Sequence, residues 1–430
     1  MSKPRVAIRA LTCRRDAATA ELLARILRKH GCNALVTSVR DFERTLRLWR
    51  PEVAVISTSS RVASIKSRFP DVGCVFLDGE GHVPAHMILA KLTSEVYRAT
   101  DLVLLWGNRI RNDIVKEMPG DDFSKMHVVG NPTHDLIHYR PSEVQYDRES
   151  KSIGFVCRFP NINNFSGKSA VRNITSSGVL DQIIVQSRGF AAMINLVRYI
   201  LQNSDFSVSI RPHPAEQIET YLDNKRNWFG NEGEQRVEID DSLCFAHWAV
   251  RQRAIVSPTS TSFLEAYLLG VPVISIDKIA ETDQFNKDYA ELAAEWQAAG
   301  ITARDCSHLM SLLTVDLPVV WHDPVIEKQL QDYCDTNVQE SACLRTARLI
   351  AEFAKKRQRQ SRIRLPVGIV DKIDELSFRR ISRFDPLHHN MNYRRGYHAL
   401  PVQIDEIADN IMLGRRIRQQ NTEQERAKSA

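Results

Sequence analysis

The sequence predicts an α/β protein with two parallel, doubly wound sheets. Short apolar segments, typical of buried strands, alternate with amphipathic helical segments over residues 1–140, and a second series of the same kind covers residues 152–320. A polar stretch with a proline and mixed charge, residues 141–151, separates the two and is expected to be a linker. Strands that alternate with helices at this spacing pair in parallel. Ligands are therefore expected beyond the carboxyl ends of the strands.

The first series contains six expected strands. Each of the first five is an apolar run followed by a helical segment, and His30-Gly31 supplies a stop for the first helix. The strands are expected at residues 5–9, 32–36, 53–56, 74–77 and 102–105, with a last strand and turn at 127–132. The helices are expected at residues 16–29, 42–49, 60–68, 83–99 and 108–117.

The second series has the same pattern and is followed by helices. Its strands are expected at residues 153–157, 207–210, 254–256 and 271–276, and its helices at 182–202, from Ala215 onward with Glu216 in the first turn, and at 263–270. Helical segments then follow at 290–298, 307–313, 325–333 and 341–357. Residues 321–430 are expected to form a helical, basic C-terminal extension.

Composition excludes several classes of protein. A hydrophobic content of 43% and a charged content of 26% in 430 residues are ordinary for a soluble globular chain with ample core. No apolar run approaches the length of a transmembrane helix, and no signal-peptide segment precedes the first strand. A cytoplasmic location is therefore expected. The eight cysteines include no C-x-x-C pair, so reduced thiols are expected rather than disulfides or structural zinc.

The charge of the chain is small but unevenly placed. The net charge of +6 is modest for this length and does not indicate a nucleic-acid partner. From Lys355 onward there are 17 Lys and Arg against 9 Asp and Glu, so this segment holds the whole excess. It is interpreted either as a solvated helix face or as a surface attracted to an anionic membrane or polymer.

A hydroxyl-rich loop before a helix indicates an anion site. Ser257-Pro258-Thr259-Ser260-Thr261-Ser262 follows an expected strand and precedes an expected helix that carries Glu265. One hydroxyl is needed to cap the helix, but five hydroxyl residues in six exceed that need. The free N–H groups of a helix N-terminus favour phosphate, and Glu265 is placed to meet a pair of hydroxyls such as those of a ribose. No G-x-G-x-x-G follows the first strand and no phosphate-loop motif is present, so an ordinary dinucleotide dehydrogenase and phosphate-loop kinases are disfavoured.

A second candidate follows the strand at 207–210, in Arg211-Pro212-His213-Pro214. The prolines restrict the backbone around His213. Arg211 and His213 are interpreted either as residues of a packed turn or as contacts to the phosphate or sugar of a ligand.

Two further motifs lie in the first series. Asp78-Gly79-Glu80-Gly81-His82 follows an expected strand, and its glycines favour a tight turn that leaves two carboxylates exposed. It is interpreted either as a plain turn or as the source of a general base; without a third ligand it gives no good metal site. Gly130-Asn131-Pro132-Thr133-His134-Asp135 is typical of a sharp turn in which Asp135 caps the following helix.

These motifs together resemble a known family. Arg211 to Pro214, Ser257 to Ser262, Glu265-Ala266 and Gly270-Val271-Pro272-Val273-Ile274 resemble the C-terminal domain of GT-B glycosyltransferases. More narrowly, the chain is similar to bacterial surface-carbohydrate (capsule and lipopolysaccharide) biosynthesis proteins, and to Kdo transferases, sialyltransferases and CDP-glycerol glycerophosphotransferases. The 130–135 turn resembles one of the surface-carbohydrate group and, less closely, of nucleotide-sugar 2-epimerases. The resemblance covers roughly residues 1–320.

The resemblance implies two Rossmann-like domains that face each other across a cleft, the first for the acceptor and the second for a nucleotide-sugar donor. It places His213 and Pro214 at a cytidine, Ser260, Thr261 and Ser262 at the phosphate and Glu265 near the ribose. Thr259, in the same hydroxyl loop, is also expected to bind the nucleotide sugar. Arg211 and His213 would stabilise the departing phosphate, and Glu80 or Asp78 would supply the catalytic base. The base motif reads Gly-Glu-Gly where two adjacent acids are usual in the family.

The expected function is therefore transfer of a sugar, CMP-linked as in Kdo donors, to a surface polysaccharide or lipopolysaccharide, with no metal or other cofactor. The basic C-terminal segment would bring the enzyme to the inner face of the cytoplasmic membrane and to a lipid-linked acceptor. Two alternatives remain open: a nucleotide-sugar 2-epimerase of the same fold, and a non-catalytic glycan-binding or scaffold subunit.

Overall fold

A computed structural model of the protein describes residues 3–58, 61–79, 92–258, 260–282, 302–315, 324–336, 340–358, 365–366, 368–370, 372–373, 375–376 and 403–417. The chain forms two compact units. The first consists of Met1–Pro141 with Lys328–Arg416, and the second of Ser142–Glu327 with Ile417–Ala430. Each contains one parallel sheet covered by helices.

The first unit contains a six-stranded sheet in the order β2-β1-β3-β4-β5-β6, with every neighbouring pair parallel. The strands are β1 (Arg5–Arg9), β2 (Asn33–Thr37), β3 (Val53–Ile56), β4 (Gly73–Leu77), β5 (Leu102–Leu105) and β6 (Met126–Val128). The helices that follow them are α1 (Cys13–Lys29), α2 (Phe42–Trp49), α3 (Val62–Arg68), α5 (Ser94–Ala99), α6 (Asn108–Glu117) and α7 (Pro132–His138). Because helices cover both faces, the strands are continuous apolar runs, as the sequence predicts.

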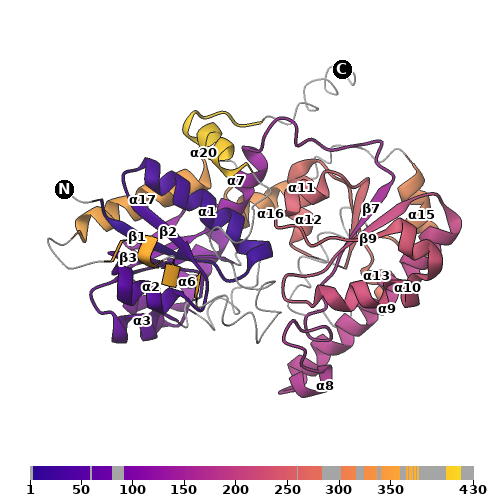
Figure 1. Ribbon diagram of the computed structural model, residues 1–430, viewed down its shortest axis with the longest axis horizontal. Helices are drawn as coiled ribbons and strands as arrows, with labels where there is room; N and C mark the ends of the chain where they lie inside the picture. Colours follow the sequence, from indigo (N-terminus) through magenta and orange to yellow (C-terminus); the bar gives the residue numbers. More distant parts are fainter. Residues whose placement is uncertain are drawn as a thin grey trace. The chain divides into compact units, whose positions relative to one another are not determined.

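The C-terminal helices belong to this first unit. α17 (Ala342–Lys356) packs against α1 and α7, and α20 (Ile404–Met412) packs against the same two helices (Figure 1). The apolar face of α20, which includes Ile407 and Ile411, is buried. The sequence analysis set residues 321–430 apart as an extension. The structure instead counts Lys328–Arg416 with the first unit.

The second unit contains a five-stranded parallel sheet in the order β11-β10-β7-β8-β9. The strands are β7 (Ser152–Val156), β8 (Ser207–Arg211), β9 (Val237–Ile239), β10 (Ala254–Ser257) and β11 (Val273–Ser275). The helices are α8 (Ala170–Asn173), α9 (Ser177–Asn203), α10 (Ile218–Arg236), α11 (Phe245–Ala249), α12 (Ser262–Leu269), α13 (Asp277–Ala280) and α15 (Cys306–Thr314), and α16 (Pro324–Cys334) leads back to the first unit. The sequence analysis did not predict β9 and began α10 too early.

The strand order of the second sheet creates a switch point beside β7. From β7 the chain goes through α9 to β8 on one side, and later returns to β10 on the other side. The connections that leave β7 and β10 therefore run to opposite sides of the sheet, and in folds of this kind ligands bind beyond the carboxyl ends of such a pair of strands. Ser257, at the end of β10, and residues 260–262, at the start of α12, lie at this switch point.

Candidate functional site

The hydroxyl loop divides into a structural part and a part at the surface. Ser257 is buried and its hydroxyl donates to the carbonyl of Val156 at 2.9 Å, so it ties β10 to β7. The Ser260 hydroxyl accepts the N–H of Ser262 at 3.3 Å and caps the first turn of α12. Thr261 is exposed, and its side chain makes no capping hydrogen bond. Thr259 lies outside the described residues.

Glu265 stands one turn inside α12 and is partly buried. Among the residues that the structure describes, no group donates a hydrogen bond to its carboxylate. Burial raises the pKa of Glu265 from the ordinary 4.5 to about 7, and the charge of Arg211 offsets part of this rise. A carboxyl group in this state is disfavoured as an ion until hydrogen-bond donors reach it. The hydroxyls of a bound ligand could supply such donors.

Arg211, at the end of β8, is engaged within the unit. Its guanidinium pairs with Asp240, donates to the Ser242 hydroxyl at 2.9 Å and to the Ser242 carbonyl at 3.0 Å. It also lies 5.6 Å from the ring centroid of Trp248. These contacts hold the buried Arg211 cation near Glu265. They engage most of the hydrogen-bond donors of the Arg211 guanidinium. The sequence could not indicate them, because Asp240 and Ser242 follow the unpredicted strand β9.

Glu216 is not in the first turn of α10 as expected, but in the turn before it. It is 2% exposed and joins two loops of the site. One carboxylate oxygen accepts the N–H of Phe159, after β7, at 2.8 Å and the N–H of His213, after β8, at 3.0 Å. The other accepts the hydroxyl of the buried Tyr221. Glu216 therefore fixes the backbone at His213, which makes it a structural residue.

His213 is partly exposed, next to Pro214, which is also partly exposed. Its Nδ1 accepts the N–H of Ala215 at 3.1 Å. An Nδ1 that accepts leaves the proton of the neutral ring on Nε2. His213 is therefore prepared to donate from Nε2.

A glycine of α9 brings the two switch-point loops together. A Cβ at Gly189 would lie 3.2 Å from Phe159, in the loop after β7, and 3.4 Å from Pro258, in the loop after β10. Gln186, one turn earlier, accepts the N–H of Asn161 at 2.7 Å. The loops after β7 and β10 thus rest on one helix, so the predicted hydroxyl loop has a rigid support.

The predicted catalytic base lies in the first unit. Asp78 follows β4, its N–H donates to the carbonyl of Leu104 at 2.8 Å, and a Cβ on the neighbouring Gly79 would lie 3.2 Å from Ser57. This places Asp78 at the carboxyl edge of the sheet. It is 4% exposed, so the prediction that it would be exposed is wrong. Glu80, Gly81 and His82 lie outside the described residues.

The turn at 130–135 has a capping role, but the residue that caps the following helix is Asn131 and not Asp135 as predicted. The Asn131 side chain accepts the N–H of Thr133 at 3.0 Å and caps α7. Asp135 lies inside α7 and is buried. Its carboxylate accepts the Ser341 hydroxyl at 2.7 Å and the Cys343 N–H at 2.6 Å, so it caps α17, not α7.

Three further observations concern the described residues only. They contain no group of three or more His, Cys, Asp or Glu side chains placed to hold a metal ion. None of their helices combines the length and apolar character needed to cross a membrane. Each of the eight cysteines has a free thiol, as predicted.

Comparison with known proteins gives the fold class. No family model matches the sequence, and no characterised protein matches it significantly. The S. aureus MnaA–UDP co-structure is 11% identical with a TM-score of 0.51, over 84% of this chain and 100% of that one. A CDPG-soaked wall teichoic acid polymerase TagF is 10% identical with a TM-score of 0.52, over 83% and 88%. UDP-GlcNAc 2-epimerase from Methanocaldococcus jannaschii is 13% identical with a TM-score of 0.50, over 81% and 99%.

With the two parallel sheets, these likenesses confirm the predicted fold: an α/β protein of the GT-B class, built from two Rossmann-like domains. At such identities they show the fold alone. The narrower resemblance to Kdo transferases and sialyltransferases stays a prediction.

Proposed function

We propose that the chain is a glycosyltransferase that takes a sugar from a nucleotide-activated, CMP-linked donor and transfers it to a surface polysaccharide or lipopolysaccharide. The observation that carries this proposal is the position and the raised pKa of Glu265. The Glu265 side chain is a partly buried carboxyl with its pKa raised to about 7, beside the N-terminus of α12 at the switch point of the second sheet. A nucleotide supplies what this place lacks, namely a phosphate for the helix terminus and a hydroxyl pair for the carboxylate.

The donor is assigned to the second unit. The phosphate would accept hydrogen bonds from the first N–H groups of α12 and from Thr259, Ser260, Thr261 and Ser262, and the ribose hydroxyls would donate to Glu265. His213 and Pro214 would meet the cytidine. Arg211 would act through its charge, because its donors are largely engaged by Asp240 and Ser242.

The reaction follows from these roles. The acceptor hydroxyl attacks the anomeric carbon while the bond from that carbon to the phosphate oxygen breaks, and CMP leaves with the electron pair. The acceptor proton passes to Glu80 or Asp78 as general base. Charge that develops on the departing phosphate is stabilised by α12, the loop hydroxyls, His213 and Arg211.

The acceptor is proposed to be a glycan on a lipid carrier at the inner face of the cytoplasmic membrane. The support for this is the excess of cations after Lys355, which would attract anionic lipids. Within that segment Arg415 is exposed, and a guanidinium nitrogen of Arg416 lies 3.4 Å from Nε2 of His138.

Thermal unfolding in the presence of CMP, CDP, UDP and GDP tests the donor site. CMP is expected to raise the unfolding midpoint most, because a ligand that binds only the folded state stabilises it by mass action. The shift should shrink in Glu265→Gln and persist in Glu219→Gln, which removes an exposed carboxyl from the first turn of α10. No shift with any of the four nucleotides would contradict the proposal.

An epimerase is the second candidate, because the M. jannaschii enzyme is about as similar in structure as TagF. Incubation with CMP- and UDP-sugars without acceptor separates the two. A transferase leaves the sugar configuration unchanged, whereas isomerised UDP-sugar would establish the epimerase.

A non-catalytic scaffold subunit is the third candidate function. Glu80→Gln and His213→Ala should abolish transfer, and unchanged cellular glycan in both variants would favour the scaffold.

A further inference from the structure

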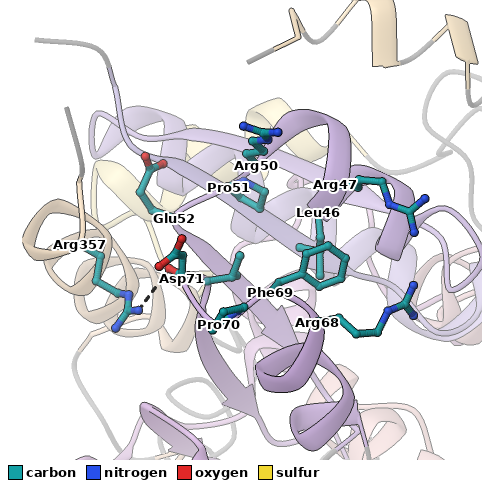
Figure 2. A pocket seen from close by; sticks show the side chains of 11 residues that line it. Leu46, Arg47, Arg50, Pro51, Glu52, Arg68, Phe69, Pro70, Asp71 and Arg357 are labelled. Carbon is teal, nitrogen blue, oxygen red and sulfur yellow. Dashed lines mark hydrogen bonds between the residues drawn. The ribbon is translucent and has the colours of Figure 1, made fainter. Parts of the chain in front are cut away.

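A cavity of about 270 Å³ lies at the amino-terminal edge of the first sheet (Figure 2). Its walls come from the turns that lead into β3 and β4 and from the C-terminal ends of α2, α3 and α17. None of the residues proposed for the donor site or as the catalytic base lines this cavity. Its size is near the lower limit of small-molecule sites.

Four arginines line the cavity, and two of them have no hydrogen-bond or ion-pair partner in the part of the chain that the structure describes. Arg68 pairs with Glu43, but both side chains are exposed, so that pair is weak. Arg357 donates to the carbonyl of Asp71 at 3.3 Å. Arg47 and Arg50 are exposed and make no hydrogen bond or ion pair to any described residue. The wall therefore holds guanidinium groups that can exchange water for an anion.

Arg50 adds a conformational observation. Its φ is +50° at the end of α2, and it precedes Pro51. Glycine or asparagine is the usual residue in this left-handed conformation, and a larger side chain costs about 1 kcal/mol or more there. Arg50 therefore adopts a backbone conformation in which a glycine would be less strained.

Two of the arginines face the carboxylates across the cavity, and Arg357 lies beside Asp71 (Figure 2). In Figure 2, Arg47 and Arg68 lie on one side of the Phe69 ring, while Glu52 and Asp71 lie on the other. The Arg68 guanidinium is 5.7 Å from the centroid of that ring. The wall therefore offers Arg47 and Arg68 at one end and an apolar surface in the middle. At the other end two carboxylates lie beside Arg357.

We propose that this cavity binds a sugar phosphate. The phosphate would be held by the planar forks of Arg47 and Arg68, which match phosphate oxygens. The sugar ring would lie on Phe69, and its hydroxyls would donate to Asp71 and to Glu52, which is 5% exposed and whose Oε2 also accepts the N–H of Arg5 at 2.7 Å. This site is separate from the proposed donor site and does not depend on it.

A competing explanation is that the arginines only compensate helix dipoles. Arg47 and Arg68 lie in the last turns of α2 and α3, where cations are favoured. Dipole compensation requires no ligand. A sugar-phosphate site, by contrast, must recognise both the phosphate and the sugar of its ligand.

Isothermal titration calorimetry with glucose 1-phosphate, glucose and inorganic phosphate tests the proposal. Glucose 1-phosphate is expected to bind at least about tenfold more tightly than either fragment, because only it reaches both ends of the cavity. Arg47→Gln and Arg68→Gln should each weaken it about tenfold, as expected for loss of a charge-assisted hydrogen bond. The matched control is Arg40→Gln, which removes an exposed arginine just before the other end of α2.

Three outcomes would overturn the proposal. Absence of glucose 1-phosphate binding leaves only dipole compensation, and equal affinity for inorganic phosphate indicates a simple anion site. Binding that CMP displaces and that Arg47→Gln does not weaken belongs to the proposed donor site. A failure of CMP to bind would contradict the transferase without affecting this test.

Discussion

Replacing Glu265 by glutamine should stabilise the second unit at pH 8 and change it little at pH 5. The folded chain holds the proton of Glu265 up to about pH 7, whereas the unfolded chain releases it near 4.5. The folded state therefore binds more protons between these values, so this residue makes stability fall as the pH rises from about 4.5 to 7. At about 1.4 kcal/mol for each pH unit, the cost reaches about 3 kcal/mol above pH 7. Glutamine has the shape of the neutral acid and avoids this cost.

The free energy of unfolding of wild type and variant, measured by urea denaturation from pH 5 to 8, gives the comparison. Hydrogen exchange of the β10 and α12 amides assigns any change to the second unit. The gain should be below about 1 kcal/mol at pH 5 and near 3 kcal/mol at pH 8, and Glu219→Gln should show no such trend. A gain that does not grow with pH would refute the argument that Glu265 is a desolvated carboxyl without donors.

Two further predictions concern the first unit. Asp135→Ala should destabilise it by about 2–4 kcal/mol, because two buried donors at the start of α17 lose their acceptor; unchanged exchange of the α17 amides would contradict this capping role. Gly107→Ala should cost about 1–3 kcal/mol in urea denaturation, because its Cβ would overlap the backbone carbonyl of Asp332. Gly178→Ala, with nothing within 4 Å of the new methyl group, is the control and should be neutral or slightly stabilising.

The arrangement of the sheets could be predicted from the sequence, because strands buried on both faces are unbroken apolar runs. β1, β3 and β5 match their expected bounds for this reason. β9 was missed because Val237-Glu238-Ile239 is short and carries a charge. The packing of α17 and α20 on the first unit was missed because contacts between residues more than 200 positions apart leave no local pattern.

Sequence reasoning singled out the hydroxyl loop as a candidate site, but it did not predict the hydrogen bonds that hold the neighbouring residues in place. The described hydroxyl residues of this loop and Glu265 lie at the switch point, because a polar run between a strand and a helix is typical of that edge of a parallel sheet. The partners of Arg211 and the clamp made by Glu216 depend on which strands are neighbours. Composition and spacing do not contain that information.

Release of CMP from a CMP-linked sugar, measured with and without a lipid-linked glycan acceptor, tests the transferase most directly. The proposal predicts that CMP forms together with an acceptor lengthened by one sugar, that the reaction requires the acceptor, and that Glu265→Gln weakens donor binding. An acceptor-independent change of sugar configuration, or no turnover of any CMP-sugar by a chain that binds CMP, would contradict it.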